Sequence, residues 1–305
     1  MASKVKGRST HLNALLQALL VTFLWSTSWV LIKIGLDDIP ALTFAGLRYT
    51  LAFLILLPVF LHSHRSVALR NLTQTTWKQL LLLGIVYYTI THGAQFISIA
   101  YLPAVTANLV LSFSPIVVAL LSTMLLAERP LKIQWLGIGV SMLGLIVYFY
   151  PVQLPAGELT GLVAALIGML ANASSAILGR SMNRTRVLSP LVITTLSMGI
   201  GAIVLLTVGL LTEGIPTLTV RGWFIVLWLA VVNTAFAFTL WNHTLRTLSA
   251  LESSLINTTM SIQIPLLALL FLGERLSGRQ VMGLVITVAG VMVVQLARVG
   301  LSRNR

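Results

Sequence analysis

The sequence predicts an all-α polytopic membrane protein with ten transmembrane helices, arranged as two inverted five-helix repeats. Three observations lead to this fold class: the composition, the spacing of the apolar segments, and a repeat with a period of 146 residues. Of the 305 residues, 57% are hydrophobic and only 9% are charged. A soluble domain carries roughly 25% charged residues, so most of the surface of this chain must face something other than water.

The composition also excludes several kinds of site. The chain has no cysteine, which rules out disulfides, zinc–thiolate sites and cysteine nucleophiles. Its formal net charge is +13, a value that in a soluble protein would suggest nucleic-acid binding. Here the basic residues stand in short loops between apolar segments, as they do in membrane proteins. We therefore predict a lipid bilayer, and no nucleic acid, as a partner of the chain.

Ten apolar segments are long enough to cross a bilayer, whose hydrocarbon core of about 30 Å needs about 20 helical residues. The first segment follows Lys4, Lys6 and Arg8, but it is too long for the apolar part of a cleaved signal peptide, so we expect a retained helix. The third segment is the least apolar of the ten. The predicted spans are residues 12–34, 41–61, 77–99, 104–126, 132–150, 159–181, 189–211, 222–245, 250–272 and 278–297.

The distribution of Lys and Arg predicts the orientation of these spans. An even number of spans places both termini on the same side of the membrane. With the N-terminus in the cytoplasm, 15 of the 20 Lys and Arg residues fall on the cytoplasmic side, while Arg48 lies within a helix. We therefore predict that both termini are cytoplasmic.

The second half of the chain repeats the first under a shift of 146 residues, without a gap from the third helix of each half to the fifth. This predicts two related domains, residues 12–150 and 159–297. Because each domain holds an odd number of helices, the second must be inverted relative to the first. Inverted repeats are common in transporters, because two such halves can rock about a site at the membrane midplane. The matched positions are Trp77 with Trp223, Leu102 with Leu248, Ala104 with Ala250, Glu128 with Glu274, Arg129 with Arg275, Gln134 with Gln280, Gly137 with Gly283 and Gly144 with Gly290.

Short motifs in the first two helices and in both halves add to this pattern. Residues 25–29 read WSTSW, and residues 40–49 read PALTFAGLRY. The fourth and ninth helices each contain a proline, Pro115 and Pro265, and each ends in Glu-Arg. In their order and spacing these motifs are similar to those of the drug/metabolite transporter superfamily, in its EamA-type branch, over nearly the whole chain.

This resemblance implies ten helices with both termini cytoplasmic, a bacterial inner membrane, and export of small metabolites, often amino acids. Ser26 and Ser28 depart from the family pattern, because they stand where glycine and asparagine are usual. Pro115 and Pro265 do not coincide under the shift of 146 residues. The central pocket is therefore expected to differ in shape from that of relatives.

Polar residues within the third span are candidate substrate ligands, because polar side chains are costly in a bilayer and face the bundle interior. Tyr88, His92 and Gln95 recur at helical spacing and so share one face. We predict that they line a cavity and form hydrogen bonds with a small-molecule substrate. The alternative is that they join neighbouring helices.

Trp25 and Trp29 share a face of the first helix. Trp25 lies about 20 Å along that helix from Leu12, at 1.5 Å per residue, which is too deep for the usual interfacial aromatic belt. A pocket wall for an apolar or aromatic substrate is one interpretation of this pair. Ordinary packing or lipid contact is the other.

Two basic residues lie within or near the ends of spans. Arg48 is buried in the second helix and needs a partner there. It either holds a substrate carboxylate or acts as a structural anchor that bonds helix-end carbonyls or reaches the interface. Lys33 stands closer to the outer end of its helix, so we expect its side chain to extend to the interface.

Five further residues, in the fourth, eighth and ninth spans, complete the predicted substrate site. They are Asn108, Ser112, Asn233, Trp241 and Asn257. No cofactor and no metal site is predicted.

Glu128 and Glu274 end paired helices at opposite membrane faces. We expect both to be structural, tying the turn to the next helix.

These features predict a secondary transporter that exports or exchanges small amphipathic metabolites by alternating access, with amino acids ranked first. No Asp or Glu lies deep in a span, which favours movement down a substrate gradient over ion coupling. A proton relay through His92 or His243 is the alternative. Other readings are a drug, nucleotide-sugar or nucleoside transporter of the same fold, a membrane-embedded enzyme, and a scaffold.

No catalytic motif of a hydrolase, metalloprotease or nucleotide-binding protein is present in the sequence. We therefore predict that the protein is not an enzyme. A monomer is expected, with a dimer as the alternative.

Overall fold

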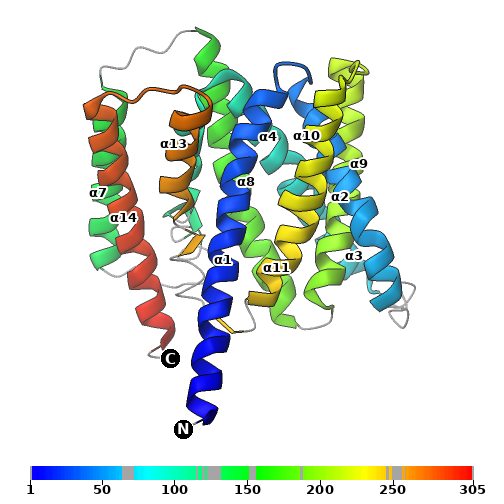
Figure 1. Ribbon diagram of the computed structural model, residues 1–305, viewed down its shortest axis with the longest axis horizontal. Helices are drawn as coiled ribbons and strands as arrows, with labels where there is room; N and C mark the ends of the chain where they lie inside the picture. The colour runs from blue at the N-terminus through cyan, green and yellow to red at the C-terminus, as the bar shows by residue number, and fades with distance from the viewer. Residues whose placement is uncertain are drawn as a thin grey trace. The chain divides into compact units, whose positions relative to one another are not determined.

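The computed structural model describes residues 2–63, 72–114, 116–118, 121, 132–150, 156–185, 188–244, 247–248, 256–257 and 259–303 (Figure 1). Every regular element in these ranges is a helix, which confirms the all-α fold class. Within these described ranges, seven helices are long and apolar enough to cross a membrane, and three shorter apolar helices accompany them. The elements are α1 (Ala2–Gly35), α2 (Ala41–Ser63), α3 (Gln74–Leu83), η2 (Gly84–Thr91), α4 (His92–Tyr101), α5 (Ala104–Leu111), α7 (Lys132–Phe149), α8 (Ala156–Thr185), α9 (Pro190–Glu213), α10 (Val220–Ala230), η3 (Val231–Phe236), α11 (Ala237–Thr244), α13 (Met260–Phe271) and α14 (Gly278–Arg303).

Most predicted spans fall within these helices, and the fourth differs the most. Helix α5 ends at Leu111, and Ser112 and Phe113 form a turn instead of continuing it. The carbonyl of Leu111 accepts a hydrogen bond from the Ser114 hydroxyl at 2.8 Å, which satisfies this helix-end group. Helical structure resumes at residues 116–118, so the predicted span 104–126 is interrupted at this turn, and most of its remainder lies outside the described residues. The predicted features Pro115 and Glu128 lie outside the described residues.

The chain divides into two compact units. The first consists of the described parts of residues 1–30, 103–155 and 236–305, and the second of those of residues 31–102 and 156–235. Each unit therefore combines segments from both halves of the sequence. In the first unit, the start of α1 and the end of α14 lie at the same end (Figure 1).

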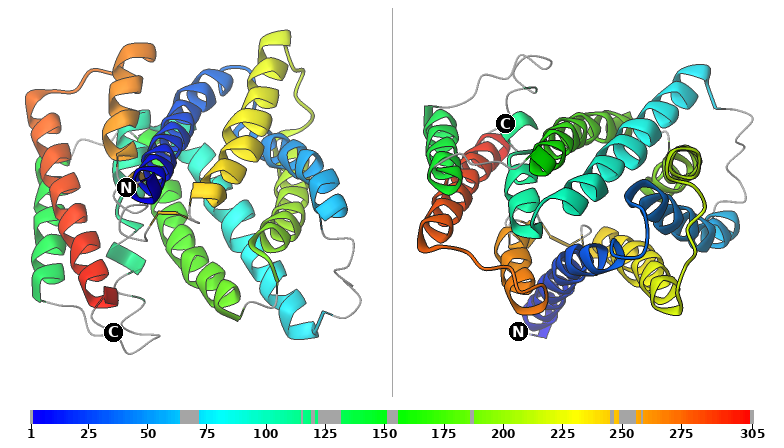
Figure 2. Two further views of the ribbon diagram at one scale, coloured as in Figure 1. Left: turned by 60° about the horizontal axis from the view of Figure 1, so that its bottom comes forward. Right: turned by 90° about the horizontal axis from the view of Figure 1, so that it is seen from above.

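Helices α7 and α14 form the closest pair in the first unit and run side by side in opposite directions (Figures 1 and 2). Gly144 faces Thr287 and Gly283: a Cβ atom on Gly144 would lie 2.5 Å from Thr287 Oγ1 and 2.7 Å from the Gly283 carbonyl oxygen. Small residues let the backbones of membrane helices approach this closely, and packing then holds them together. This helix pair therefore has no room for a side chain at residue 144.

The contacts across α7 and α14 are reciprocal. Ser141 and Thr287, which correspond under the shift of 146 residues, each direct a hydroxyl to the other's carbonyl oxygen, at 3.4 and 3.5 Å. Reciprocal contacts of this kind are what two equivalent helices make about a two-fold axis.

The second unit is built on α2 and α9, which are also antiparallel neighbours. A Cβ atom on Gly46 of α2 would lie 2.7 Å from the backbone nitrogen of Leu206 on α9. A cluster of buried apolar side chains forms the core at one end of this unit, and η2 packs against both α8 and α9. The cluster consists of Phe60, Leu80, Leu83, Met182, Leu188, Val192 and Ile193.

In both units, a glutamate carboxylate accepts hydrogen bonds from the first backbone N–H groups of a different helix. In the first unit, Glu274 accepts hydrogen bonds from the backbone N–H groups of Ala104 and Val105, at 2.6 and 3.1 Å. In the second, Glu213 accepts from those of Leu42 and Thr43, at 3.1 and 2.9 Å. The first N–H groups of a helix have no intrahelical partner and favour negative charge. Glu274 is thus structural, as the sequence predicts.

Replacing Glu213 by alanine is expected to lower the free energy of unfolding by about 1–2 kcal/mol, the cost of losing a helix cap. Unfolding in detergent, followed by tryptophan fluorescence, measures this effect. Asp37→Ala is the matched control, because Asp37 is also an exposed acidic residue of the second unit and its side chain forms no hydrogen bond with the described residues. Equal stability of the two variants would contradict the capping role.

Among the described residues, two segments widen into a π-helix: η2 lies between α3 and α4, and η3 lies between α10 and α11. A shift of 146 residues carries 85–90 onto 231–236, the full extent of η3. π-helical turns are rare and often mark functional sites. The sequence reasoning missed both segments, because the apolar pattern of a span does not record a local change of helical register.

Candidate functional site

The buried cation of the second unit is Arg48, on α2. Only 5% of its surface is exposed, and its Nε donates a hydrogen bond to Thr234 Oγ1 at 3.1 Å. The guanidinium carbon lies 5.2 Å from the centroid of the Tyr49 ring, within the range of a cation–π contact. No Asp or Glu among the described residues forms an ion pair with Arg48, so a buried positive charge lacks a counter-charge.

Aromatic rings surround this cation. Tyr49 stacks on His92 with centroids 4.3 Å apart, and it meets the edge of Tyr88 at 5.8 Å. Tyr87 lies 4.9 Å from both Tyr88 and His92. We call Arg48, Tyr49, Tyr87, Tyr88 and His92 the arginine–aromatic cluster.

The π-helical segments place several of these groups. Tyr87 and Tyr88 belong to η2, and Thr234 belongs to η3. The Thr234 hydroxyl donates to the Leu229 carbonyl at 2.8 Å while it accepts from Arg48. Thr91 makes the equivalent bond to the Val86 carbonyl in η2, at 2.9 Å. In each case a threonine hydroxyl donates a hydrogen bond to the carbonyl oxygen five residues earlier in the widened turn.

The predicted polar face of the third span is present in the structure. The rings of Tyr88 and His92 lie 5.9 Å apart, and His92 Nδ1 is 3.2 Å from Gln95 Oε1. His92 Nε2 is buried and has no hydrogen-bond partner among the described residues. The cluster therefore offers a guanidinium, flat apolar rings and one unused imidazole nitrogen, a set suited to an anion with an apolar body.

The first unit holds a second group, formed by Trp25 of α1 with Phe238 and Trp241 of α11. The Trp25 ring lies 5.4 Å from that of Phe238 and 5.2 Å from that of Trp241. Its Nε1 is buried, without a partner in the part of the chain that the structure describes. The next residue, Ser26, donates to Gln263 Oε1 on α13 at 2.9 Å. The sequence-predicted residues Trp25 and Trp241 are thus brought together.

The other predicted site residues are dispersed. Trp29 and Asn108 are buried in the first unit, where Asn108 Nδ2 has no partner among the described atoms, and Asn233 is buried within η3 of the second. The Ser112 hydroxyl donates to the Leu109 carbonyl oxygen of the preceding helix at 2.7 Å. Asn257 is exposed.

Lys33 makes a contact that the sequence analysis did not predict. Its Nζ donates to the carbonyl oxygens of Ile99 and Leu102, at 2.6 and 2.8 Å, at the end of α4. Carbonyls at the end of a helix have no intrahelical partner and attract cations. Hydrogen bonding to helix-end carbonyls was one of the alternatives predicted for Arg48. In the structure it is Lys33 that forms these bonds.

Sequence reasoning missed Tyr49, Thr234 and Phe238 as members of these groups. Tyr49 could have been found from its position beside Arg48, because an aromatic ring next to a buried cation is a ready partner. Nothing in the sequence pairs Thr234 with Arg48, since the two are 186 residues apart.

The apolar helices define a polytopic α-helical membrane protein. The EamA-like transporter family matches the chain over residues 12–150 and again over residues 159–296. The chain belongs to this family and is a membrane transporter, not an enzyme.

Curated relatives agree with this assignment. Protein PecM of Dickeya dadantii is 30% identical over 230 residues, covering 74% of this chain and 76% of PecM. The uncharacterized transporter YoaV of Bacillus subtilis is 26% identical over 287 residues, covering 90% of this chain and 93% of YoaV. A probable amino-acid metabolite efflux pump of Salmonella typhimurium is 28% identical over 300 residues, covering 90% and 92%. A solved crystal structure has the same fold, with a TM-score of 0.66 at 19% identity, over 93% of this chain and 97% of its own.

Proposed function

We propose that this transporter exports or exchanges small amphipathic metabolites that carry a carboxylate, with amino acids first, by alternating access. The observation that carries the proposal is Arg48, a buried guanidinium set against aromatic rings without an acidic partner in the described residues. A substrate carboxylate supplies the counter-charge through paired hydrogen bonds. The rings of Tyr49 and Tyr88 contact the apolar body of the substrate.

The Salmonella relative supports the same substrate class, since it is named a probable amino-acid metabolite efflux pump. The proposed architecture is ten spans in two inverted repeats, with both termini in the cytoplasm of a bacterial inner membrane. Three observations support it: the two family matches, the coincidence of the π-helical segments under the shift of 146 residues, and the reciprocal contacts of Ser141 and Thr287. The three shorter helices are the remaining spans.

Counterflow into proteoliposomes tests the transport reaction. The vesicles are loaded with unlabelled amino acids, and a labelled panel is supplied outside. We expect uptake of one class of amino acid, weakened when Trp25 or Gln95 is replaced by alanine. Uptake of no amino acid would contradict the proposed substrate and redirect the search to nucleosides, sugars and drugs.

Alternating access predicts that the site opens to one side of the membrane at a time. A single cysteine placed at Gln95 is expected to react with an impermeant thiol reagent from one side only, and the substrate is expected to change the rate of labelling. The chain has no native cysteine, so the reagent has no other target. Equal labelling from both sides, with or without substrate, would indicate a channel.

A further inference from the structure

Arg48 is held by the protein through one nitrogen of its guanidinium group. Its Nε donates to Thr234 Oγ1 at 3.1 Å, and the guanidinium carbon lies 5.2 Å from the centroid of the Tyr49 ring. Neither Nη nitrogen has a hydrogen-bond partner in the part of the chain that the structure describes. Both keep some exposed surface, whereas the unpaired Nε2 of His92 is fully enclosed. The Nη nitrogens are therefore the donors that a ligand can reach.

The acceptor of this bond, Thr234, is itself fixed by the widened turn of η3. Its side chain is fully buried, and its hydroxyl donates to the carbonyl oxygen of Leu229 at 2.8 Å. Because the hydroxyl hydrogen is directed to that carbonyl, the hydroxyl oxygen meets Arg48 as an acceptor. Thr234 thus holds the Nε end of the guanidinium from a position that belongs to the helix and not to a loop.

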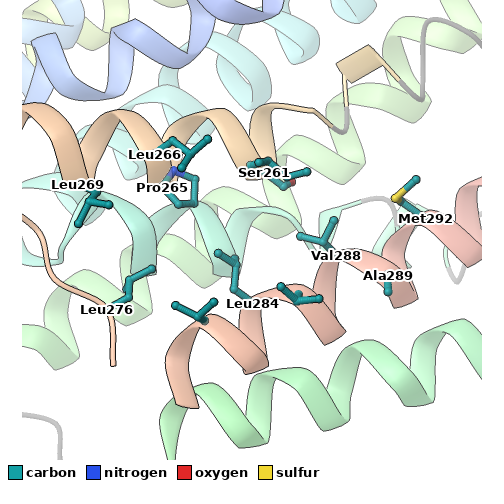
Figure 3. A pocket seen from close by; sticks show the side chains of 12 residues that line it. Ser261, Pro265, Leu266, Leu269, Leu276, Leu284, Val288, Ala289 and Met292 are labelled. Carbon is teal, nitrogen blue, oxygen red and sulfur yellow. The ribbon is translucent and has the colours of Figure 1, made fainter. Parts of the chain in front are cut away.

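Two other groups of residues in the described ranges lack a cation. A groove of about 510 Å³ between α13 and α14 in the first unit has Ser261 as its single polar lining residue (Figure 3). The group of Trp25, Phe238 and Trp241 offers rings and one unpaired indole N–H. Neither presents a charged pair of donors to a carboxylate. Recognition of an acid group therefore depends on Arg48 and on how its guanidinium is oriented.

A guanidinium can offer a parallel pair of N–H groups to a carboxylate along either of two edges, one formed by Nη1 and Nη2 and one that includes Nε. The bond to Thr234 occupies Nε and closes the second edge. We propose that Thr234 is a positioning residue of the transporter, which holds Arg48 so that its Nη1–Nη2 edge binds both oxygens of the substrate carboxylate. This inference rests on the proposed function and narrows its substrate class to molecules with a free carboxylate, because an amide or ester lacks the second anionic oxygen.

Counterflow with an amino acid and its primary amide tests this orientation. The probes are the panel amino acid that the wild type takes up best and, as competitor, the primary amide of that amino acid. Thr234→Val replaces the hydroxyl by a methyl group of similar size, so Arg48 Nε loses its acceptor. We expect the half-saturation concentration for the amino acid to rise at least about tenfold, as for the loss of one hydrogen bond to a charged group. The inhibition constant of the amide should stay unchanged.

Thr91→Val is the matched control for the local effect on a π-helix. Thr91 donates the same kind of bond to the Val86 carbonyl oxygen in η2, at 2.9 Å, but accepts none from a cation in the described ranges. It should therefore keep the wild-type preference for the acid over the amide. Thr234→Ser retains the hydroxyl and should keep this preference too. If the valine variant of Thr234 does not fold, Thr234→Ala carries the same expectation, because it removes the hydroxyl without adding a methyl group.

The results separate this inference from the proposed function. The positioning role of Thr234 is overturned if Thr234→Val keeps the wild-type preference for the acid, or if Thr91→Val loses as much of it. It is also overturned if Thr234→Ser loses as much as the valine variant, because the methyl packing and not the hydroxyl would then matter. Uptake of no amino acid by the wild type would instead overturn the proposed function, and this inference with it.

Discussion

Replacing Arg48 by glutamine is expected to reduce substrate affinity in the counterflow assay by at least about thirtyfold. Removing one partner of a buried, hydrogen-bonded charge pair costs about 2–5 kcal/mol, and 2 kcal/mol corresponds to about thirtyfold. Arg48→Lys keeps the charge but loses the planar pair of donors, so its affinity is expected to fall between those of the wild type and the glutamine variant. The concentration dependence of uptake measures both effects.

Thermal unfolding separates this substrate role from a structural one. Because no acidic residue in the described ranges pairs with Arg48, its buried charge is not expected to stabilise the fold, and Arg48→Gln should leave the unfolding temperature unchanged or raise it. Arg221→Gln removes an exposed arginine of the same unit and should transport normally. A variant of Arg48 that unfolds at lower temperature, while its folded fraction transports with normal affinity, would show that Arg48 is an anchor.

Replacing Gly144 by leucine is expected to destabilise the protein by about 3 kcal/mol, at the upper end of the usual cost of overpacking. Even the first side-chain carbon would lie 2.5 Å from Thr287 Oγ1, so α7 and α14 would have to separate along their contact. Loss of the reciprocal bonds between Ser141 and Thr287 would follow. Denaturant titration in detergent measures the change.

Gly139 supplies the matched control on the same helix. It is exposed, and a Cβ atom there would meet nothing within 4 Å. Leucine has the higher helix propensity by about 0.8–1 kcal/mol, so Gly139→Leu should be neutral or stabilising. If both leucine variants unfolded alike, the close approach of α7 and α14 would not be a source of stability.

Part of the candidate site could be predicted from the sequence, and the reason lies in local spacing. Tyr88, His92 and Gln95 share a face of one helix, and residues three or four apart meet wherever the helix packs. Arg48 stood out because a cation within an apolar run is rare. Trp25 and Trp241 were both predicted, but nothing in the sequence placed their rings 5.2 Å apart.

The contacts that give these residues their roles come from distant segments. Arg48 and Lys33 are both basic groups within or near spans, and the sequence offered helix-end carbonyls to the first and the interface to the second. In the structure, Lys33 donates hydrogen bonds to the carbonyl oxygens of Ile99 and Leu102, and Arg48 donates one to the hydroxyl of Thr234. The partners that each cation finds depend on how the helices pack.

The apolar composition is sufficient to predict that this protein lies in a membrane and that its apolar segments are helices. A bilayer core offers no hydrogen bonds, so a spanning backbone must satisfy its own N–H and C=O groups. The positions where the helices widen into η2 and η3, the close approach of α7 to α14 and the groups around Arg48 are visible in the folded protein alone. These features depend on contacts between segments far apart in the chain, which hydrophobicity and spacing do not encode.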